Sequence, residues 1–363
     1  MLEDVADAER YYSEWDRLVV DRGTPFSSPA WIMPWLRHPP VAGIEPRVVV
    51  VTESESVLGV FPFCRRKGSR GIRSYSLAGS LTAHGSEPVI MRGREADAYK
   101  AVGRVLRANS HDFDLIRMDG VRAVVPIAIG LREAYHGKRL SVERLRRTPL
   151  PLIELERCSY EDWFQKRPPS FRRELMRKRR RCLQDGYRLE TLTAAKDIVD
   201  RLEPFVDLHS RRWADRGGSA VMYPGIVEML TEVAQRLDGS GRMRLSVLEN
   251  DHQVVSVDVT MSTGRTATGW LGGFDEKAAR YQPGMQTMLA SIEHSWSAGD
   301  SMFDLGPGTQ AHKLSLATGA NYMESWVLAR RGAPYTSAVQ LMPWAVVRRC
   351  SPSMRATRGG PGQ

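Results

Sequence analysis

The chain of 363 residues carries 52 Lys and Arg against 42 Asp and Glu, which gives a formal net charge of +10. Hydrophobic residues make up 42% of the sequence and charged residues 26%, which are ordinary values for a soluble protein long enough for two domains. The longest apolar run, 123–131, is too short to span a bilayer, so we expect no stable membrane insertion. The positive excess favours an anionic partner such as nucleic acid, anionic lipid or a phosphate-rich cofactor, although arginines that only confer solubility would explain it equally well.

We expect a cytoplasmic protein. The first seven residues are acidic and lack the basic and apolar regions of a signal peptide. The four cysteines are far apart and form no CxxC pair, which suits thiols in a reducing compartment better than disulfides or a zinc site. No HExxH, Walker A, GxSxG or dinucleotide motif occurs, and the eight histidines are scattered, so we expect no metal.

The first half of the sequence predicts mixed α and β structure. Two apolar runs, 47–51 and 57–63, flank a polar stretch and predict a hairpin. Helical spacing predicts a helix at 94–107, and shorter strands are expected at 74–78, 87–91 and 113–118.

The second half predicts helices, then strands, then a strand–helix–strand unit. Prolines near 148–151 predict a domain boundary, and Ser170 is the expected N-cap of a helix that ends at about 184. Further helices are expected at 196–214, 223–237 and from Pro283 to about 298. The expected strands are 242–249, 253–262, 266–271, 301–305 and 323–329.

Several motifs of the second half resemble the BioF2-like or CelD-like acetyltransferase domain of the GNAT superfamily, which is related to the Fem-type aminoacyl transferases. They are the opening helix 171–175, Gly269-Trp270-Leu271-Gly272-Gly273-Phe274-Asp275, Arg280-Tyr281-Gln282-Pro283-Gly284-Met285, Phe303-Asp304-Leu305-Gly306-Pro307-Gly308 and His312-Lys313. The resemblance covers most of 150–330, and a weaker echo lies at 76–80. It implies an α/β fold of two tandem GNAT-like domains, each a mixed, mostly antiparallel sheet flanked by helices. We therefore predict a degenerate GNAT-like domain at 1–150, the acetyltransferase domain at 151–335 and a basic, flexible tail at 336–363.

The turn 281–284 is the expected donor site. It stands at a helix N-terminus, where free backbone amides and the helix dipole attract phosphate. In GNAT enzymes this turn reads Arg/Gln-x-x-Gly-x-Gly/Ala and holds the pyrophosphate of coenzyme A. This chain has Tyr281 at the first position and Gln286 at the last, so the donor stays open between an acyl-CoA and an aminoacyl-tRNA. The candidate cofactor-binding residues are Tyr281, Gln282, Gly284, Met285 and Gln286.

Catalytic roles follow from the resemblance and from the chemistry of acyl transfer. Amine attack on a thioester or ester creates an oxyanion, and the resemblance assigns its stabilisation to Lys313. Asp304 is expected to orient Lys313 or the acceptor amine. Asp258, on the polar face of an alternating strand, is a candidate base alongside His312 and Tyr281, although positioning alone can accelerate such a reaction. The resemblance also implies substrate contacts for Trp270 and His312.

The densest run of positive charge is the helix segment 172–181. It predicts either a phosphate-binding surface or simply a solvated helix face.

The function expected is transfer of an acetyl or other acyl group from coenzyme A to a primary amine of a small molecule or envelope precursor. Aminoacyl-tRNA-dependent transfer is the first alternative and a non-catalytic binding module is the second. We expect the acceptor to bind between the two domains, where pockets commonly form. The sequence does not indicate the oligomeric state.

Overall fold

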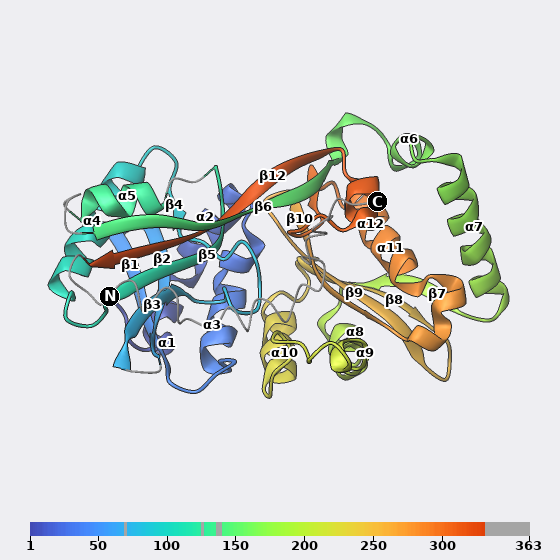
Figure 1. Cartoon of the computed structure of the whole chain (residues 1–363), viewed down its shortest axis with the longest axis horizontal. Coiled ribbons are helices and arrows are strands. Elements are labelled where there is room, and N and C mark those ends of the chain that lie inside the picture. Colours follow the sequence, from blue (N-terminus) through green and yellow to red (C-terminus); the bar gives the residue numbers. More distant parts are fainter. Residues whose placement is uncertain (69–70, 125–126, 136–139, 331–363) are drawn as a thin grey trace, which may run out of the picture.

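The computed structural model of the chain describes residues 1–68, 71–124, 127–135 and 140–330 (Figure 1). The basic tail predicted at 336–363 lies outside these residues. The fold is α/β, with helices on both faces of a largely antiparallel sheet.

The two halves have similar plans. The first half has the strands β1 (Ile44–Glu53), β2 (Ser56–Lys67), β3 (Arg73–Leu77), β4 (Val89–Ile90) and β5 (Leu115–Arg122). Its helices are α1 (Val5–Ala8), α2 (Tyr12–Arg22), α3 (Pro29–Arg37), α4 (Glu95–Ala108) and α5 (Ile127–Ala134). Strands β1, β2 and β3 are antiparallel, and β3 then pairs in parallel with β5, which follows α4 in the sequence.

The second half repeats this plan on a larger scale. Its strands are β6 (Leu140–Glu154), β7 (Arg188–Leu192), β8 (Met243–Glu249), β9 (Val254–Thr263), β10 (Thr266–Phe274), β11 (Met302–Asp304) and β12 (Gly319–Arg330). Its helices are α6 (Tyr160–Gln165), α7 (Pro169–Gln184), α8 (Ala195–Val199), α9 (Leu202–Ala214), α10 (Ile226–Arg236), α11 (Pro283–Ser297) and α12 (Ala311–Leu316). Strands β7 to β10 are antiparallel, and β10 pairs in parallel with β11 across the connecting helix α11.

The sheets of the two halves are joined into one. Within the described residues the sheet has 12 strands in the order β1-β2-β3-β5-β12-β6-β11-β10-β9-β8-β7, with β4 on β2. The last strand, β12, returns to the first half and inserts between β5 and β6. Figure 1 shows β6 and β12 crossing the middle of the molecule side by side.

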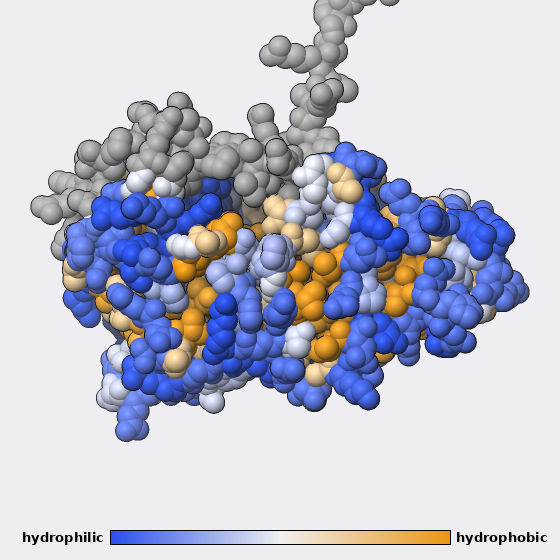
Figure 2. All heavy atoms as spheres, turned by 90° about the horizontal axis from the view of Figure 1, so that it is seen from below, coloured by the Kyte–Doolittle hydropathy of each residue, from blue (hydrophilic) through white to orange (hydrophobic). Residues whose placement is uncertain are grey.

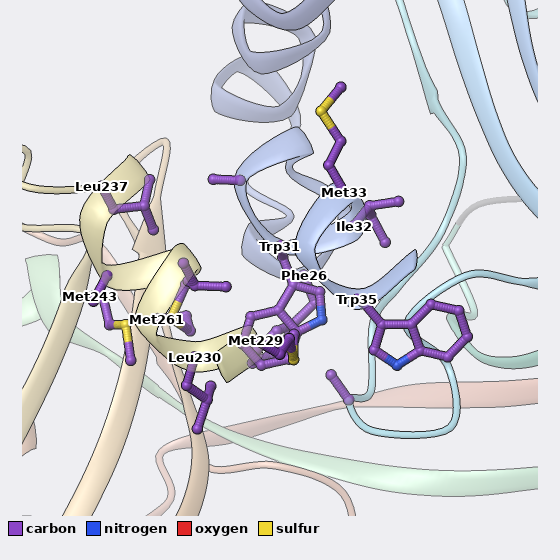
Figure 3. Packing of buried hydrophobic residues seen from close by; sticks show 14 of the residues in the cluster. Phe26, Trp31, Ile32, Met33, Trp35, Met229, Leu230, Leu237, Met243 and Met261 are labelled. Carbon is purple, nitrogen blue, oxygen red and sulfur yellow. The ribbon is translucent and has the colours of Figure 1, made fainter. Parts of the chain in front are cut away.

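A shared hydrophobic core also joins the halves. Helix α3 packs against α10, and the core around them contains side chains of both halves, including Trp31, Phe26 and Met229 (Figure 3). The rings of Phe26 and Trp31 meet edge to face with their centroids 4.9 Å apart. Because α3 carries large apolar side chains on all sides, it is stable only when buried in this way.

The predicted domain boundary at 148–151 falls inside strand β6. Pro149 and Pro151 lie inside β6, opposite Tyr322 and Ala320 of β12. Their carbonyls accept hydrogen bonds from the loop after β11, at 2.9 Å from Gly308 N and 3.0 Å from Leu305 N. The backbone N and C=O of each proline therefore point to the β11 side of β6, beyond the last residue pair between the two strands. Their missing N–H groups thus interrupt no hydrogen-bond ladder.

Two helix boundaries also differ from the prediction. The expected helix 196–214 is two helices, α8 and α9, with a break at Asp200 and Arg201. Pro204 explains the break, because proline is tolerated in the first turn of α9 but would disrupt one continuous helix. Helix α7 begins at Pro169, a favoured first helical residue, so Ser170 lies inside the helix and is not its cap. Over the described ranges, no helix is both long and apolar enough to cross a membrane.

Candidate active site

The candidate site lies where β10 and β11 separate. The two strands pair from Thr266–Met302 to Thr268–Asp304, and no further. Strand β10 continues to Phe274, whereas β11 ends at Asp304 and is followed by the turn at Gly306. Side chains and loops from both halves meet at this point.

Asp304 is the last residue of β11 and its side chain is buried, with 9% of its surface exposed. Its Oδ1 accepts a hydrogen bond of 2.7 Å from the backbone N–H of Gly306. Burial raises the pKa of this carboxyl to about 6, although the Gly306 hydrogen bond and the charges of Lys313 and Arg122 act in the opposite direction. Asp304 can therefore exchange a proton near neutral pH.

Lys313 lies on α12, and its Nζ donates a hydrogen bond of 3.2 Å to the carbonyl of Pro307. Burial lowers the pKa of its ammonium, while Asp304 and then Asp258 raise it. Gly306 has φ of +78°, and a Cβ there would lie 3.1 Å from Nζ. The turn thus needs glycine both for its backbone conformation and for the close approach of the ammonium.

Asp258 lies on β9 and faces α11, where the Ser291 hydroxyl donates a hydrogen bond of 2.7 Å to its Oδ2. Burial raises its pKa to about 6 as well. Phe303 and Leu305 pack in the core beneath α11, so Asp304 between them faces the opposite side of the sheet. Lys313 feels the charges of both carboxylates, one from each face. The Lys313 ammonium therefore lies within electrostatic range of both predicted carboxylates, which lie on opposite faces of the sheet.

Two side chains of the predicted donor turn, Tyr281 and Gln286, are buried and bond other parts of the protein. Tyr281 is buried, donates a hydrogen bond to Asp185 and accepts one of 2.6 Å from Arg280. Gln286 is also buried, and its amide donates to the carbonyl of Leu175 on α7 at 3.2 Å. Both side chains fix the turn against α7.

The backbone of that turn is tightly constrained. Gln282 has φ of +53°, which is uncommon without glycine, and its carbonyl accepts hydrogen bonds from Met285 N at 3.0 Å and Gln286 N at 3.1 Å. A Cβ on Gly284 would lie 2.8 Å from the ring of Phe274, so glycine lets α11 approach the end of β10. Met285 is half-buried against the core beneath α11.

The two predicted substrate-binding residues lie apart from one another. Trp270 is buried between the halves, where its Nε1 donates to the carbonyl of Thr82 at 2.8 Å and its ring contacts Trp31. His312 is exposed on α12, next to Lys313.

His84, in a loop of the first half, was missed by sequence reasoning. A Cβ built on Gly306 would lie 3.5 Å from Cε1 of His84 and 3.1 Å from Nζ of Lys313, so both side chains approach the same turn. Burial, followed by the charge of Lys313, lowers its pKa to about 3, so the imidazole is neutral. A lone histidine more than 200 residues from the motif carries no local signal, and only the fold brings it here.

Arg212 on α9 was also missed. Its guanidinium lies over the ring of Phe274, 4.3 Å from the ring centroid, beside the start of α11. Burial, and then the nearby Arg216, lowers its pKa. Across the described residues it has neither a hydrogen bond nor an ion pair, so this cation is available to an anion.

The basic helix α7 is partly neutralised. Lys178 pairs with Glu174 at 3.0 Å and Arg179 with Glu293 at 3.4 Å. Arg181 pairs with Asp185 at 3.9 Å, and Arg172 bonds the Gln165 amide oxygen. Three further arginines have neither a hydrogen bond from the side chain nor a carboxylate partner in the part of the chain that the structure describes; we call Arg173, Arg177 and Arg180 the α7 arginine cluster. The end of the molecule where α7 lies, on the right in Figure 2, is covered mainly by hydrophilic side chains.

Comparison with known families identifies the domain that carries this site. Residues 169–314 match the family model of the acetyltransferase (GNAT) domain. This segment runs from α7 to α12 and includes Asp258, Asp304 and Lys313. Curated proteins gave no significant match to the sequence.

Solved structures share the whole fold at low sequence identity. FemX matches with a TM-score of 0.62 at 10% identity, over 91% of this chain and 98% of the other. The C-terminal domain (DUF2156) of a protein assigned as a lysylphosphatidylglycerol synthetase from Agrobacterium fabrum matches with a TM-score of 0.57 at 15% identity, over 95% and 97%. A conserved protein of unknown function from Bacteroides thetaiotaomicron matches with a TM-score of 0.51 at 13% identity, over 90% and 98%.

The segment that carries the site, residues 169–314, is therefore similar to the acetyltransferase (GNAT) domain. This match supports an acyltransferase over a non-catalytic binding module, and the chain shares its fold with FemX. Among the described residues, no group of three or more His, Cys, Asp or Glu side chains could hold a metal ion.

Proposed function

We propose that the protein transfers an acyl group from an acyl-CoA thioester to a primary amine. The observation that carries the proposal is the Lys313 ammonium with two buried carboxylates, Asp304 and Asp258, at the point where β10 and β11 separate. A cation beside weakly acidic carboxyls suits a reaction that creates an oxyanion and releases a proton from an amine.

In this mechanism Lys313 donates a hydrogen bond to the oxygen of the acyl carbonyl as the amine attacks. Negative charge develops on that oxygen, and the ammonium stabilises it more strongly than it stabilises the neutral carbonyl. Asp304 or Asp258 accepts a proton from the attacking nitrogen. The C–N bond forms, the C–S bond breaks, and the leaving thiolate takes up a proton.

The residues around the start of α11 fit a donor that carries phosphates. In the first turn of α11, Pro283 has no N–H and Met285 N bonds the Gln282 carbonyl, so among the described residues the Gly284 N–H and the positive end of the helix dipole are left for a phosphate. Arg212 adds an unpaired guanidinium beside this turn. Because the side chains of Tyr281 and Gln286 hold the turn in place, the backbone and Arg212 would make the phosphate contacts.

Two assays test the proposal on the full chain. Acetyl-CoA alone should raise the melting temperature, since a ligand at about a hundred times its Kd stabilises by about 2.7 kcal/mol. Thiol release should then depend on an added primary amine. Lys313→Met should lower kcat by about 10²- to 10³-fold with little change in acetyl-CoA binding, whereas Lys196→Met, at an exposed lysine of α8, should match the parent. Equal kcat in the two variants would refute the role of Lys313.

Aminoacyl-tRNA is the second candidate donor, and the α7 arginine cluster favours it. Helix α7 is bonded to the donor turn through Gln286 and Leu175, so phosphates along α7 would lie near the site. Under this alternative, filter binding retains tRNA in a strongly salt-dependent way and acetyl-CoA gives no thermal shift.

A further inference from the structure

A pocket lies between the two halves of the molecule, beside the catalytic residues. The first half contributes Thr24, Phe26, His84 and Arg122 to its lining, and the second half contributes Thr268 and Asp304. The carboxylate of Asp304 thus accepts the hydrogen bond of the Gly306 turn and also lines this pocket.

The charge of the pocket favours a cation. Among the described residues that line it, Arg122 and Asp304 are the only charged side chains. Arg122 is already neutralised, because Glu87, which is 1% exposed, accepts hydrogen bonds from its Nε at 2.9 Å and from its Nη2 at 2.7 Å. Asp304 has no ion-pair partner within the described ranges, and the charge of Lys313, which does not line the pocket, acts on it without a direct contact. A positively charged ligand can therefore pair with the carboxylate of Asp304. An anionic ligand finds the guanidinium of Arg122 already paired with Glu87.

The remaining lining is uncharged and largely apolar. Its apolar part comes from both halves and consists of Pro25, Phe26, Val124, Leu150, Leu152, Met302, Tyr322 and Met323. Thr24 adds one hydroxyl: the residue is 3% exposed, and its Oγ1 has no hydrogen-bond partner among the residues that the structure describes. Buried polar groups almost always have partners, so this hydroxyl fits a polar atom of a bound molecule.

His84 connects the pocket to the reaction centre. It lines the pocket, and its ring borders the Gly306 turn on which Lys313 also lies. Its Nε2 is buried and has no hydrogen-bond partner in the described part of the chain. A ligand in the pocket can therefore direct its end group toward Lys313 past a neutral imidazole.

We propose that this pocket is the acceptor site, and that the acceptor is a primary ammonium on an uncharged, partly apolar body whose hydroxyl or carbonyl group bonds Thr24. The inference rests on the proposed amine acceptor and adds its chemical class. Asp304 holds the ammonium and then takes its proton, so the nitrogen becomes nucleophilic beside the acyl carbonyl. Acceptors that carry phosphates on their bodies are excluded by the same charge balance.

Thr24→Val tests the pocket, with Thr263→Val as its matched control. Both replacements remove a buried hydroxyl without a hydrogen-bond partner in the described ranges, but Thr263 lies on β9 and is not among the described lining residues of the pocket. The probes are aminohexanol, hexanediol and aminohexyl phosphate. Binding to the full chain is measured without a donor, and turnover is then measured with acetyl-CoA.

We expect aminohexanol to bind, and the other two probes to bind at least tenfold more weakly. Thr24→Val should weaken aminohexanol binding and raise its KM by about 3- to 10-fold, as expected for one lost hydrogen bond, with kcat unchanged. Thr263→Val should leave both values unchanged, and the two variants should be as stable as the parent.

The outcomes separate this inference from the proposed function. Three results would overturn the acceptor site but leave the acyl transfer intact. They are turnover with acetyl-CoA that Thr24→Val does not change, no binding of aminohexanol, and a preference for aminohexyl phosphate. Thr24-dependent binding of aminohexanol without any use of acetyl-CoA would support the site and reject the donor.

Discussion

Replacing Asp304 with asparagine should make the protein more stable and inactive. The side chain is buried at the end of β11, and its Oδ1 accepts the N–H of Gly306 at 2.7 Å. Asparagine has nearly the same shape and keeps an acceptor at that position. It lacks the charge whose burial opposes folding and lacks the ability to accept a proton from an amine.

The size of the stability gain follows from the pKa of this carboxyl. Its value rises from 3.8 to about 6 in the folded protein, and a difference of one pKa unit corresponds to about 1.4 kcal/mol. The ionised carboxylate therefore costs about 3 kcal/mol at pH 8, and Asp304→Asn should recover about 2–3 kcal/mol of unfolding free energy. Because the folded pKa lies above the unfolded one, the folded state binds more protons between pH 4 and 6. Parental stability thus falls as pH rises through this window, and the gain should vanish near pH 4.

Urea unfolding followed by tryptophan fluorescence at about pH 4, 6 and 8 measures this gain. Asp200→Asn, at an exposed carboxylate after α8, is the control and should leave stability within about 0.5 kcal/mol of the parent at each pH. Acyl transfer by Asp304→Asn should fall at least tenfold at pH 8. The reasoning is refuted if Asp304→Asn is less stable than the parent at pH 8, or if its gain does not shrink toward pH 4.

Three further predictions concern the donor, the pH dependence and the packing of α11. Gly284→Ala places a Cβ 2.8 Å from the Phe274 ring, so it should lower the unfolding free energy by about 1–3 kcal/mol in urea titrations, and an unchanged midpoint would mean that the ring moves freely. The value of kcat/KM should fall as pH drops below about 6, because Asp258 and Asp304 become protonated and cannot accept a proton; a profile that is flat from about pH 5 to 8 would exclude both as bases. Replacing the α7 arginine cluster with glutamine should reduce the slope of tRNA affinity against salt by about 2–3 if tRNA is the donor, and should leave acetyl-CoA turnover unchanged if it is not.

Local patterns predicted most of the elements near the site. The alternation of β9 placed Asp258 on its polar face, and Pro283 marked the start of α11, as the structure has it. The break between α8 and α9 could also have been found, because Pro204 is incompatible with the interior of a continuous helix. The course of β6 could not, since prolines signal a boundary in the sequence, and only the pairing with β12 shows that their nitrogens face the end of a ladder.

Much of the candidate site depends on contacts that no sequence pattern records. Tyr281 and Gln286 match a donor motif by position, yet their side chains bond Asp185 and the backbone of Leu175. Trp270 lies in a motif of the second half but bonds a carbonyl of the first. His84 reaches the Gly306 turn only because the halves share a core, which is a long-range consequence of packing.

The return of β12 into the first half affects how the chain must be assembled. During synthesis β5 is complete at Arg122, but its partner β12 begins only at Gly319, about 200 residues later. At 5–20 residues per second the edge of β5 stays open for about 10–40 s on the ribosome. An unpaired strand edge invites pairing with other chains, so this interval is when the nascent protein is most prone to aggregate and most in need of a chaperone.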